Sequence, residues 1–159
     1  MCRTTLQIDL PDATATCDLA RRIAPRLRPG DCLLLVGDVG AGKTHFARCL
    51  IRTLLTEAED IPSPTFTLVQ EYDGHSGAIW HADLYRLTDP AEVIELGLED
   101  AFRTAICLVE WPDRLGDLAP ADAMTLTLRP PPGDPDARQL TLTAPHRYTP
   151  LLKELTRHA

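Results

Sequence analysis

The pattern of apolar and polar residues predicts strands that alternate with helices. Residues 32–36 (CLLLV) form a short apolar run, which is typical of a strand buried on both faces. Over residues 46–54, apolar side chains recur with helical spacing and leave a basic opposite face. Residues 105–111 form a second apolar run, which ends in Glu110 and Trp111. We therefore expect two buried parallel strands, with a helix following the first of them.

The rest of the chain carries weaker signals of the same kind. Period-two alternation or β-branched content predicts further strands over residues 4–10, 67–72, 78–82, 123–129 and 137–143. Capping residues and helical spacing predict helices over residues 12–27, 89–97 and 150–158. A Pro- and Gly-rich stretch joins the last two strands and predicts an antiparallel hairpin near the C-terminus. We therefore expect an α/β fold with a mostly parallel sheet and, at 159 residues, a single domain over residues 1–159.

A phosphate-binding motif lies between the first apolar run and the helix after it. The residues with the spacing G-x-x-x-x-G-K-[ST] are Gly37, Gly42, Lys43 and Thr44. In such a loop, glycines let backbone N–H groups converge on phosphate oxygens at the positive end of a helix. Lys43 is expected to reach the β- and γ-phosphates, and the Thr44 hydroxyl to bind Mg²⁺. The motif thus predicts a site for a nucleotide and Mg²⁺.

Acidic side chains follow two of the predicted strands. Glu110 ends a short apolar strand, as the acid of a Walker B segment does, and would reach the Mg²⁺ directly or through water. Asp83 follows the strand predicted over residues 78–82. Two prolines in residues 61–66 would suit a loop that holds the Ser63 or Thr65 hydroxyl toward a ligand. A plain helix-to-strand connection fits that loop nearly as well.

The overall charge limits the direct partners of the chain. The formal net charge is −7, which argues against a domain that grips nucleic acid by neutralising phosphates. We therefore expect no DNA binding, and RNA binding only through a partner. The sequence shows neither an N-terminal export signal nor an apolar run near eighteen residues, so we expect no membrane association.

Cysteine and histidine usage predicts neither disulfides nor a zinc site. The cysteines Cys2, Cys17, Cys32, Cys49 and Cys107 are odd in number and widely spaced, and three of them lie in apolar runs. We interpret them as reduced residues, which predicts a cytoplasmic protein. The five histidines show no zinc spacing, and we interpret them as surface residues or residues with satisfied hydrogen bonds.

Five ordered segments, residues 37–44, 63–69, 81–87, 95–99 and 106–111, together resemble the TsaE (YjeE) family of small bacterial P-loop ATPases. The resemblance extends over nearly the whole chain and implies a three-layer P-loop NTPase fold with ATP and Mg²⁺ as cofactors. It also implies a role with the TsaD and TsaB proteins in forming threonylcarbamoyladenosine beside the anticodon of tRNA. In that family, TsaD and TsaB carry out the transfer and ATP hydrolysis by the TsaE-like protein sustains turnover.

The resemblance assigns roles to individual residues. The nucleotide-binding residues would be Asp38, Val39, Gly40, Ala41, Gly42, Lys43, Thr44 and His45, with Ala13 near the base and Trp111 beside the site. Thr44 and Glu110 would bind the metal. The catalytic residues would be Asp83, Glu110 and Thr65, of which Asp83 and Thr65 line the γ-phosphate side. His45 stands where the family prefers Thr or Ser.

Three other classes of protein share part of this pattern. A GTP-binding switch would need an Asn-Lys-x-Asp motif, and the sequence contains no Asn. A small-molecule kinase fits the phosphate loop and the Walker B acid equally well, but it usually needs an Arg-rich lid, and only Arg86 and Arg103 are candidates near the site. A nucleotide-gated binding module would scarcely hydrolyse ATP. If the chain is an ATPase, we expect that it hydrolyses ATP slowly by itself and that its partners accelerate or productively couple the hydrolysis.

Overall fold

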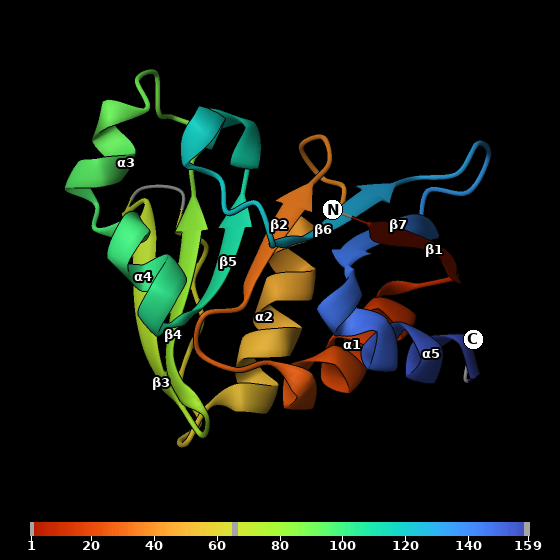
Figure 1. Cartoon of the computed structure of the whole chain (residues 1–159). Coiled ribbons are helices and arrows are strands. Elements are labelled where there is room, and N and C mark those ends of the chain that lie inside the picture. Colours follow the sequence, from red (N-terminus) through yellow and green to blue (C-terminus); the bar gives the residue numbers. More distant parts are fainter. Residues whose placement is uncertain (1, 65–66, 158–159) are drawn as a thin grey trace.

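The computed structural model describes residues 2–64 and 67–157. In this part of the chain, seven strands form one sheet in the order β1-β7-β6-β2-β5-β4-β3 (Figure 1). Their bounds are Arg3–Leu10 (β1), Cys32–Val36 (β2), Val69–Gly74 (β3), Gly77–Asp83 (β4), Ile106–Glu110 (β5), Met124–Arg129 (β6) and Arg138–Pro145 (β7). The four central strands, β6, β2, β5 and β4, run parallel, and the antiparallel pairs lie toward the two edges. The predicted parallel centre and C-terminal hairpin, β6–β7, are both confirmed.

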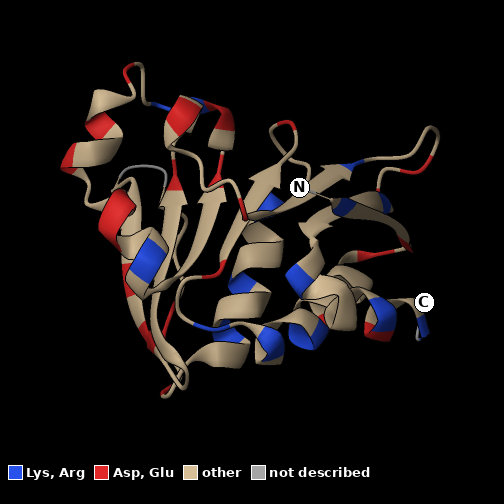
Figure 2. Cartoon of the chain, in the orientation of Figure 1, with Lys and Arg blue, Asp and Glu red and all other residues tan. Residues whose placement is uncertain are grey.

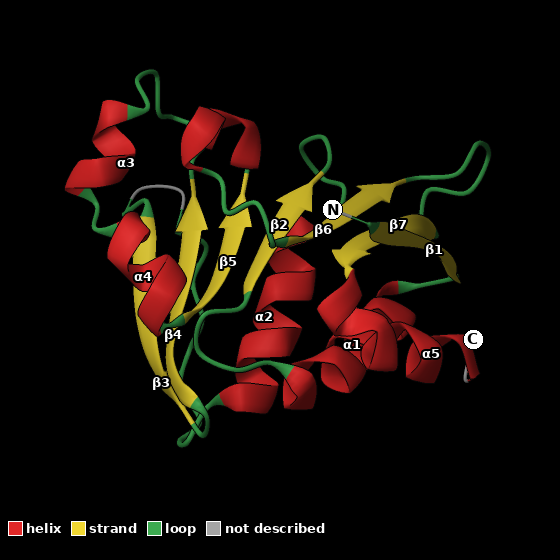
Figure 3. Ribbon diagram, viewed as in Figure 1, coloured by secondary structure: helices red, strands yellow, loops and turns green. Residues whose placement is uncertain are grey.

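Helices cover both faces of this sheet (Figure 3). The α-helices are Ala13–Ile23 (α1), Lys43–Leu54 (α2), Ala91–Glu95 (α3), Leu98–Thr104 (α4) and Thr149–Arg157 (α5), and short 3₁₀ turns are Ala24–Arg26 (η1), Pro112–Leu118 (η2) and His146–Tyr148 (η3). Leu108 of β5 belongs to an apolar cluster with α1, α2 and α5, whereas its neighbour Cys107 belongs to a second cluster with α3, α4 and η2. Successive strand residues point to opposite faces, so the fold has three layers.

Local sequence signals explain where the first helix begins and ends. Asp12 is the N-cap of α1, and its side chain accepts a hydrogen bond of 2.8 Å from the Ala15 backbone N–H. The α-helix ends at Ile23 and continues as η1 rather than as the helix predicted to residue 27. Pro25, which has no backbone N–H, lies in that turn.

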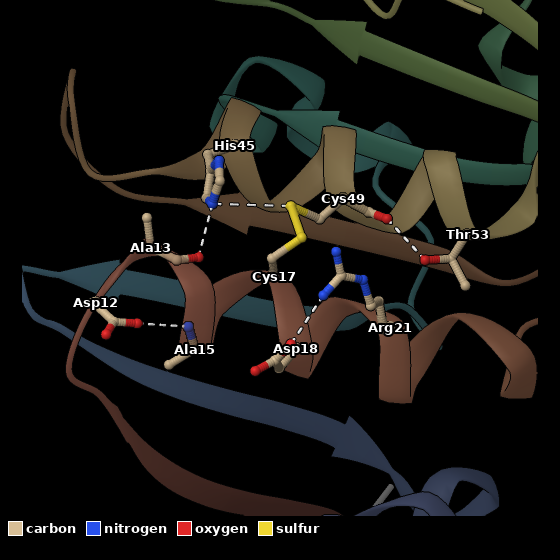
Figure 4. Close-up of polar contacts among 9 residues, drawn as sticks. All are labelled: Asp12, Ala13, Ala15, Cys17, Asp18, Arg21, His45, Cys49 and Thr53. Atoms are coloured by element: carbon tan, nitrogen blue, oxygen red, sulfur yellow. Dashed lines mark hydrogen bonds and ion pairs between the residues drawn. A yellow bond between two sulfur atoms is a disulfide. The ribbon is translucent and has the colours of Figure 1, made fainter. Parts of the chain in front are cut away.

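A disulfide joins the first two α-helices. Cys17 of α1 and Cys49 of α2 are bonded, with their Cα atoms 5.2 Å apart (Figure 4). The interpretation of all five cysteines as reduced is therefore wrong for this pair. The two residues are 32 positions apart, and only the packing of α1 against α2 brings them together. Cys2, Cys32 and Cys107 are free thiols, as expected.

The strand register determines which side chains meet at the carboxyl edge of the sheet. In the parallel β4–β5 pair, Asp83 lies opposite Glu110, and in the β2–β5 pair Leu35 lies opposite Glu110. The loop after β2 and the ends of β4 and β5 therefore share one edge, where parallel α/β sheets bind ligands. Among the described helices, none is long and apolar enough to cross a bilayer.

Candidate nucleotide-binding site

The loop between β2 and α2 has the backbone that a phosphate-binding loop requires. Gly42 precedes α2 with φ of 104°, a left-handed conformation that glycine adopts without a steric penalty. Gly37 is closely packed, since a Cβ atom there would lie 2.8 Å from the Leu128 carbonyl oxygen. The chain can therefore turn sharply from β2 into α2, and α2 begins at Lys43 with its N-terminus at the loop.

Lys43 is a buried cation that closes this loop. Its Nζ donates to the Gly37 carbonyl and, at 3.0 Å, to the Asp38 carbonyl. The same nitrogen lies 4.3 Å from the centre of the Trp111 ring, within cation–π range. Burial lowers the pKa of Lys43, and nearby carboxylates, Glu110 foremost, oppose that shift. The ammonium group is thus held by neutral groups that a phosphate could replace.

Three side chains form a polar chain across α2, β5 and β4. Thr44 Oγ1 donates a 2.7 Å hydrogen bond to Glu110 Oε1. His81 Nε2 lies 2.7 Å from the other carboxylate oxygen, Glu110 Oε2. Glu110 and His81 are 2% and 0% exposed, so both belong to the interior of the site. The two predicted metal ligands, Thr44 and Glu110, are therefore in direct contact.

Asp83 lies beside Glu110 at the end of β4. The residue is buried, and one of its oxygens accepts a 3.1 Å hydrogen bond from the Tyr85 backbone N–H. Burial raises the pKa of the Asp83 carboxyl, and the hydrogen bond from Tyr85 acts in the opposite direction. The Tyr85 ring in turn packs against Trp111, with ring centres 4.9 Å apart. Asp83 is thus a desolvated acid at the rim of the loop.

Most of the residues predicted for the site line one pocket of ≈ 410 Å³. Its lining residues are Val39, Gly40, Ala41, Gly42, Lys43, Thr44, His45, Ser63, Asp83, Tyr85, Glu110 and Trp111. Asp38 lines a neighbouring pocket of ≈ 460 Å³, which shares Trp111 with the first. Ala13 lines neither of these two pockets, but its carbonyl oxygen lies 2.9 Å from His45 Nε2 (Figure 4). Thr65 lies outside the described residues.

Comparison with known proteins identifies the family. The family model described as "Threonylcarbamoyl adenosine biosynthesis protein TsaE" matches residues 10–139, which is most of the chain. The chain belongs to the TsaE family. The tRNA threonylcarbamoyladenosine biosynthesis protein TsaE of Bacillus subtilis is 38% identical over 143 residues, which cover 88% of this chain and 87% of that protein. The family predicted from the sequence motifs is thus confirmed.

Other relatives extend this comparison to the fold. The crystal structure of Bacillus subtilis YdiB superposes with a TM-score of 0.81 at 32% identity and covers 99% of this chain and 98% of that chain. The TsaE protein of Rickettsia conorii is 47% identical over 93 residues, or 58% of this chain. The chain spans about half the length of the Rickettsia conorii and Rickettsia felis relatives, 53% and 54%.

Two residues of this TsaE chain belong to the site although neither was predicted for it. Arg138 of β7 donates from Nε to the Ala41 carbonyl at 2.9 Å and from a terminal nitrogen to the Gly40 carbonyl at 3.1 Å, so it braces the loop. No local pattern around Arg138 signals this role, because the contact depends on how β7 is placed. The interpretation of His81 as a surface or satisfied residue is wrong, because it is fully buried and its Nδ1 has no partner among the described residues. Its place in an alternating strand, two residues before Asp83, is the signal that could have found it.

Proposed function

We propose that this TsaE chain binds Mg-ATP and hydrolyses it. The observation that carries the proposal is the convergence of Lys43, Thr44, Asp83 and Glu110 on one pocket at the N-terminus of α2. A loop with inward N–H groups, a lysine, a hydroxyl and carboxylates are the groups that P-loop enzymes use to position and polarise a γ-phosphate.

In this proposal, each side chain of the site has its own role in binding or hydrolysis. Loop N–H groups and the Lys43 ammonium bind the phosphates, with Lys43 exchanging its carbonyl partners for phosphate oxygens. Asp83, whose pKa is raised by burial, orients the attacking water and accepts its proton. Trp111 and Tyr85 pack together at the rim and exclude water from that side.

The donor set suits Mg²⁺. Thr44 offers a hydroxyl and Glu110 a carboxylate, and both are hard oxygen ligands 2.7 Å apart. In the described part of the chain, no cluster of three His, Cys, Asp or Glu side chains could hold a metal by itself. Mg²⁺ bound with a nucleotide needs none, because phosphates and water complete its coordination. When bound, the ion neutralises charge that develops on the phosphate oxygens.

We also propose that this hydrolysis sustains the formation of threonylcarbamoyladenosine in tRNA, with TsaD and TsaB as partners. The family description and the names of the relatives support the pathway. Figure 2 shows that Asp and Glu outnumber Lys and Arg on α3, α4 and η2, and that the reverse holds on α1, α2 and α5. The acidic side would repel RNA, so the tRNA is reached indirectly, through protein partners.

The decisive experiment measures ATP hydrolysis by the purified chain, alone and with the TsaD and TsaB proteins of the same host. Formation of threonylcarbamoyladenosine on a tRNA transcript is followed in parallel. We expect slow Mg²⁺-dependent hydrolysis alone, faster hydrolysis with the partners, and multiple turnovers of modification only when the chain is present. Rapid hydrolysis whose rate does not change when the partners are added, with phosphate transferred to a small molecule, would overturn the proposal.

A further inference from the structure

We infer that His81 is a positioning residue that holds Glu110 in the orientation needed to bind Mg²⁺. This inference rests on the magnesium site proposed above. His81 Nε2 lies 2.7 Å from Glu110 Oε2, and both side chains are buried. A carboxylate can only accept a hydrogen bond, so Nε2 carries the proton and donates it. Glu110 is thereby held from β4, the strand next to its own.

The surroundings of His81 explain why its imidazole serves this one contact. Along β4 and β5, His81 shares a face with Ile79, Ile106 and Leu108, which belong to the apolar cluster beneath α1, α2 and α5. An imidazole in such a layer loses its hydration, and that loss is offset only where a hydrogen bond replaces water. The contact with Glu110 is the replacement.

The second ring nitrogen shows that packing stability alone does not account for a histidine here. His81 Nδ1 is buried and has no hydrogen-bond partner in the described part of the chain. A buried polar atom without a partner destabilises the fold, so an apolar side chain would suit this layer better. The hydrogen bond from Nε2 to Glu110 compensates for this cost. Without it, Glu110 Oε2 would lose this donor.

The two donors to Glu110 differ in what else they do. Thr44 donates to Oε1 and is itself a proposed ligand of Mg²⁺, so its hydroxyl is shared between two roles. His81 has no such second role. The imidazole therefore keeps Oε2 fixed and leaves Oε1 directed toward Thr44, where the ion would lie. Residues that orient a metal ligand in this way typically change metal affinity by about 10–100-fold when they are removed.

The test uses metal binding rather than turnover. Mn²⁺ replaces Mg²⁺, and its binding to the full chain with a non-hydrolysable ATP analogue is measured by electron paramagnetic resonance. We compare His81→Gln with His81→Asn, because the glutamine amide nitrogen can take the place of Nε2 whereas the shorter asparagine amide matches Nδ1. We expect His81→Asn to weaken Mn²⁺ binding about 10–100-fold and His81→Gln to recover most of it. Metal-free binding of the analogue should change little in either variant.

Two further variants separate positioning from folding. His81→Leu removes both ring nitrogens, restores an apolar layer and is expected to bind Mn²⁺ as weakly as His81→Asn. Tyr72→Phe is the matched control, because Tyr72 Oη is, over the described residues 2–64 and 67–157, the other buried polar side-chain atom without a partner and lies outside the pocket. Wild-type Mn²⁺ affinity in His81→Asn, or no advantage of Gln over Asn, would overturn the positioning role. A wild-type chain without metal-dependent nucleotide binding would overturn the proposed function as well.

Discussion

Thr44 Oγ1 and Glu110 Oε1 are joined by a 2.7 Å hydrogen bond, although the two residues are 66 positions apart in the sequence. The contact exists because β2 and β5 are parallel neighbours, so the loop after β2 and the end of β5 reach the same edge of the sheet. The predicted phosphate loop and the predicted Walker B acid thereby lie in one site. Substitutions of Thr44 and of Glu110 should therefore affect the same step, the hydrolysis of ATP, and its rate can be measured.

Glu110→Ala should reduce ATP hydrolysis much more than ATP binding. Loss of the carboxylate removes a proposed Mg²⁺ ligand, and the charge stabilisation supplied by such an ion is worth several kcal/mol, or on the order of 10²–10³ in rate. Lys43 and the loop N–H groups remain to hold the phosphates. Single-turnover hydrolysis and calorimetric titration with ATP measure the two effects, with Glu99→Ala on α4 as the control. Full turnover of Glu110→Ala in Mg²⁺ would contradict the Walker B assignment.

Lys43→Ala should lose ATP affinity and keep the fold. The Nζ atom contacts loop carbonyls and the Trp111 ring, not the apolar core, so its loss removes a charge-assisted contact to phosphate worth about 1.5–3 kcal/mol. This corresponds to about 10–100-fold weaker binding by calorimetry. Lys153→Ala, at the only other lysine of the sequence, is the matched control and should bind as the wild type does. Unchanged affinity in a folded Lys43→Ala chain would remove the basis for the phosphate site.

Most of the fold could be predicted from short-range patterns. The apolar run at residues 32–36 coincides with β2, and the helical spacing over residues 46–54 falls within α2. Asp12 caps α1 as its residue type predicts. These features depend on the chemistry of a few neighbouring residues, which is visible in one sequence. The Cys17–Cys49 bridge depends instead on how α1 packs against α2, and no spacing rule encodes that.

Trp111→Gly should be more stable than Trp111→Ala. Trp111 has φ of 58°, a left-handed conformation that costs a residue with a Cβ atom roughly 1–2 kcal/mol. Both variants lose the ring, but only glycine relieves the backbone. We expect Trp111→Gly to unfold in urea with a free energy about 1 kcal/mol higher than that of Trp111→Ala. At Tyr85, where φ is not positive, the usual order should hold, with Ala more stable than Gly. The same order at both positions would show that Trp111 carries no backbone strain.

Reduction of the Cys17–Cys49 disulfide should destabilise the fold. The bridge joins residues 32 positions apart, one on α1 and one on α2, and such cross-links typically contribute about 2–4 kcal/mol to the free energy of unfolding. Cys17→Ser in oxidising buffer and dithiothreitol added to the wild type should therefore lower stability by the same amount in urea unfolding. Dithiothreitol should leave Cys17→Ser unchanged. An unaltered unfolding curve of Cys17→Ser would show that the bridge contributes nothing.

Alkylation of the native chain tests independently whether the Cys17–Cys49 disulfide is present. Cys2 is exposed, whereas burial raises the pKa of the Cys32 thiol and raises that of Cys107 to about 12. A thiol with a raised pKa has little reactive thiolate near neutral pH. Iodoacetamide without reductant should therefore modify Cys2 alone, as counted by mass spectrometry. Labelling of Cys17 under these conditions would contradict the bridge.

The site could be predicted only as far as its residues belong to motifs. Lys43, Thr44 and Glu110 stand in recognisable segments, and the structure brings them to one pocket. His81 begins one of these segments, but nothing in that segment predicts its contact with Glu110, and Arg138 belongs to none of them. One acts across a strand pair whose register is set by the whole sheet, and the other comes from β7, nearly a hundred residues after the loop it braces. Contacts of that kind follow from tertiary packing, which local residue patterns do not record.

The chain should be a slow ATPase that its partners accelerate. Among the described residues that line the pocket, none is an arginine and Lys43 is the one lysine. An arginine supplied from elsewhere is worth about 10³–10⁵ in rate in related GTPases, because it stabilises charge that develops on the phosphate. Arg86 is exposed and lies three residues after Asp83, where β4 ends, which suits a surface that docks a partner. Steady-state hydrolysis should therefore rise when TsaD and TsaB are added.

Arg86→Ala separates docking from chemistry in this prediction. If Arg86 belongs to the docking surface, the variant should keep the slow hydrolysis of the isolated chain and lose most of the acceleration, because the partner then binds less tightly. Arg103→Ala is the control, since Arg103 is also an exposed arginine but lies on α4, where it pairs with Asp100. The measurement is the rate of phosphate release as a function of partner concentration, at low and at physiological salt, because contacts between exposed charges weaken as salt rises. Equal acceleration of Arg86→Ala and the wild type would place the docking surface elsewhere, and rapid hydrolysis by the isolated chain would refute the coupling itself.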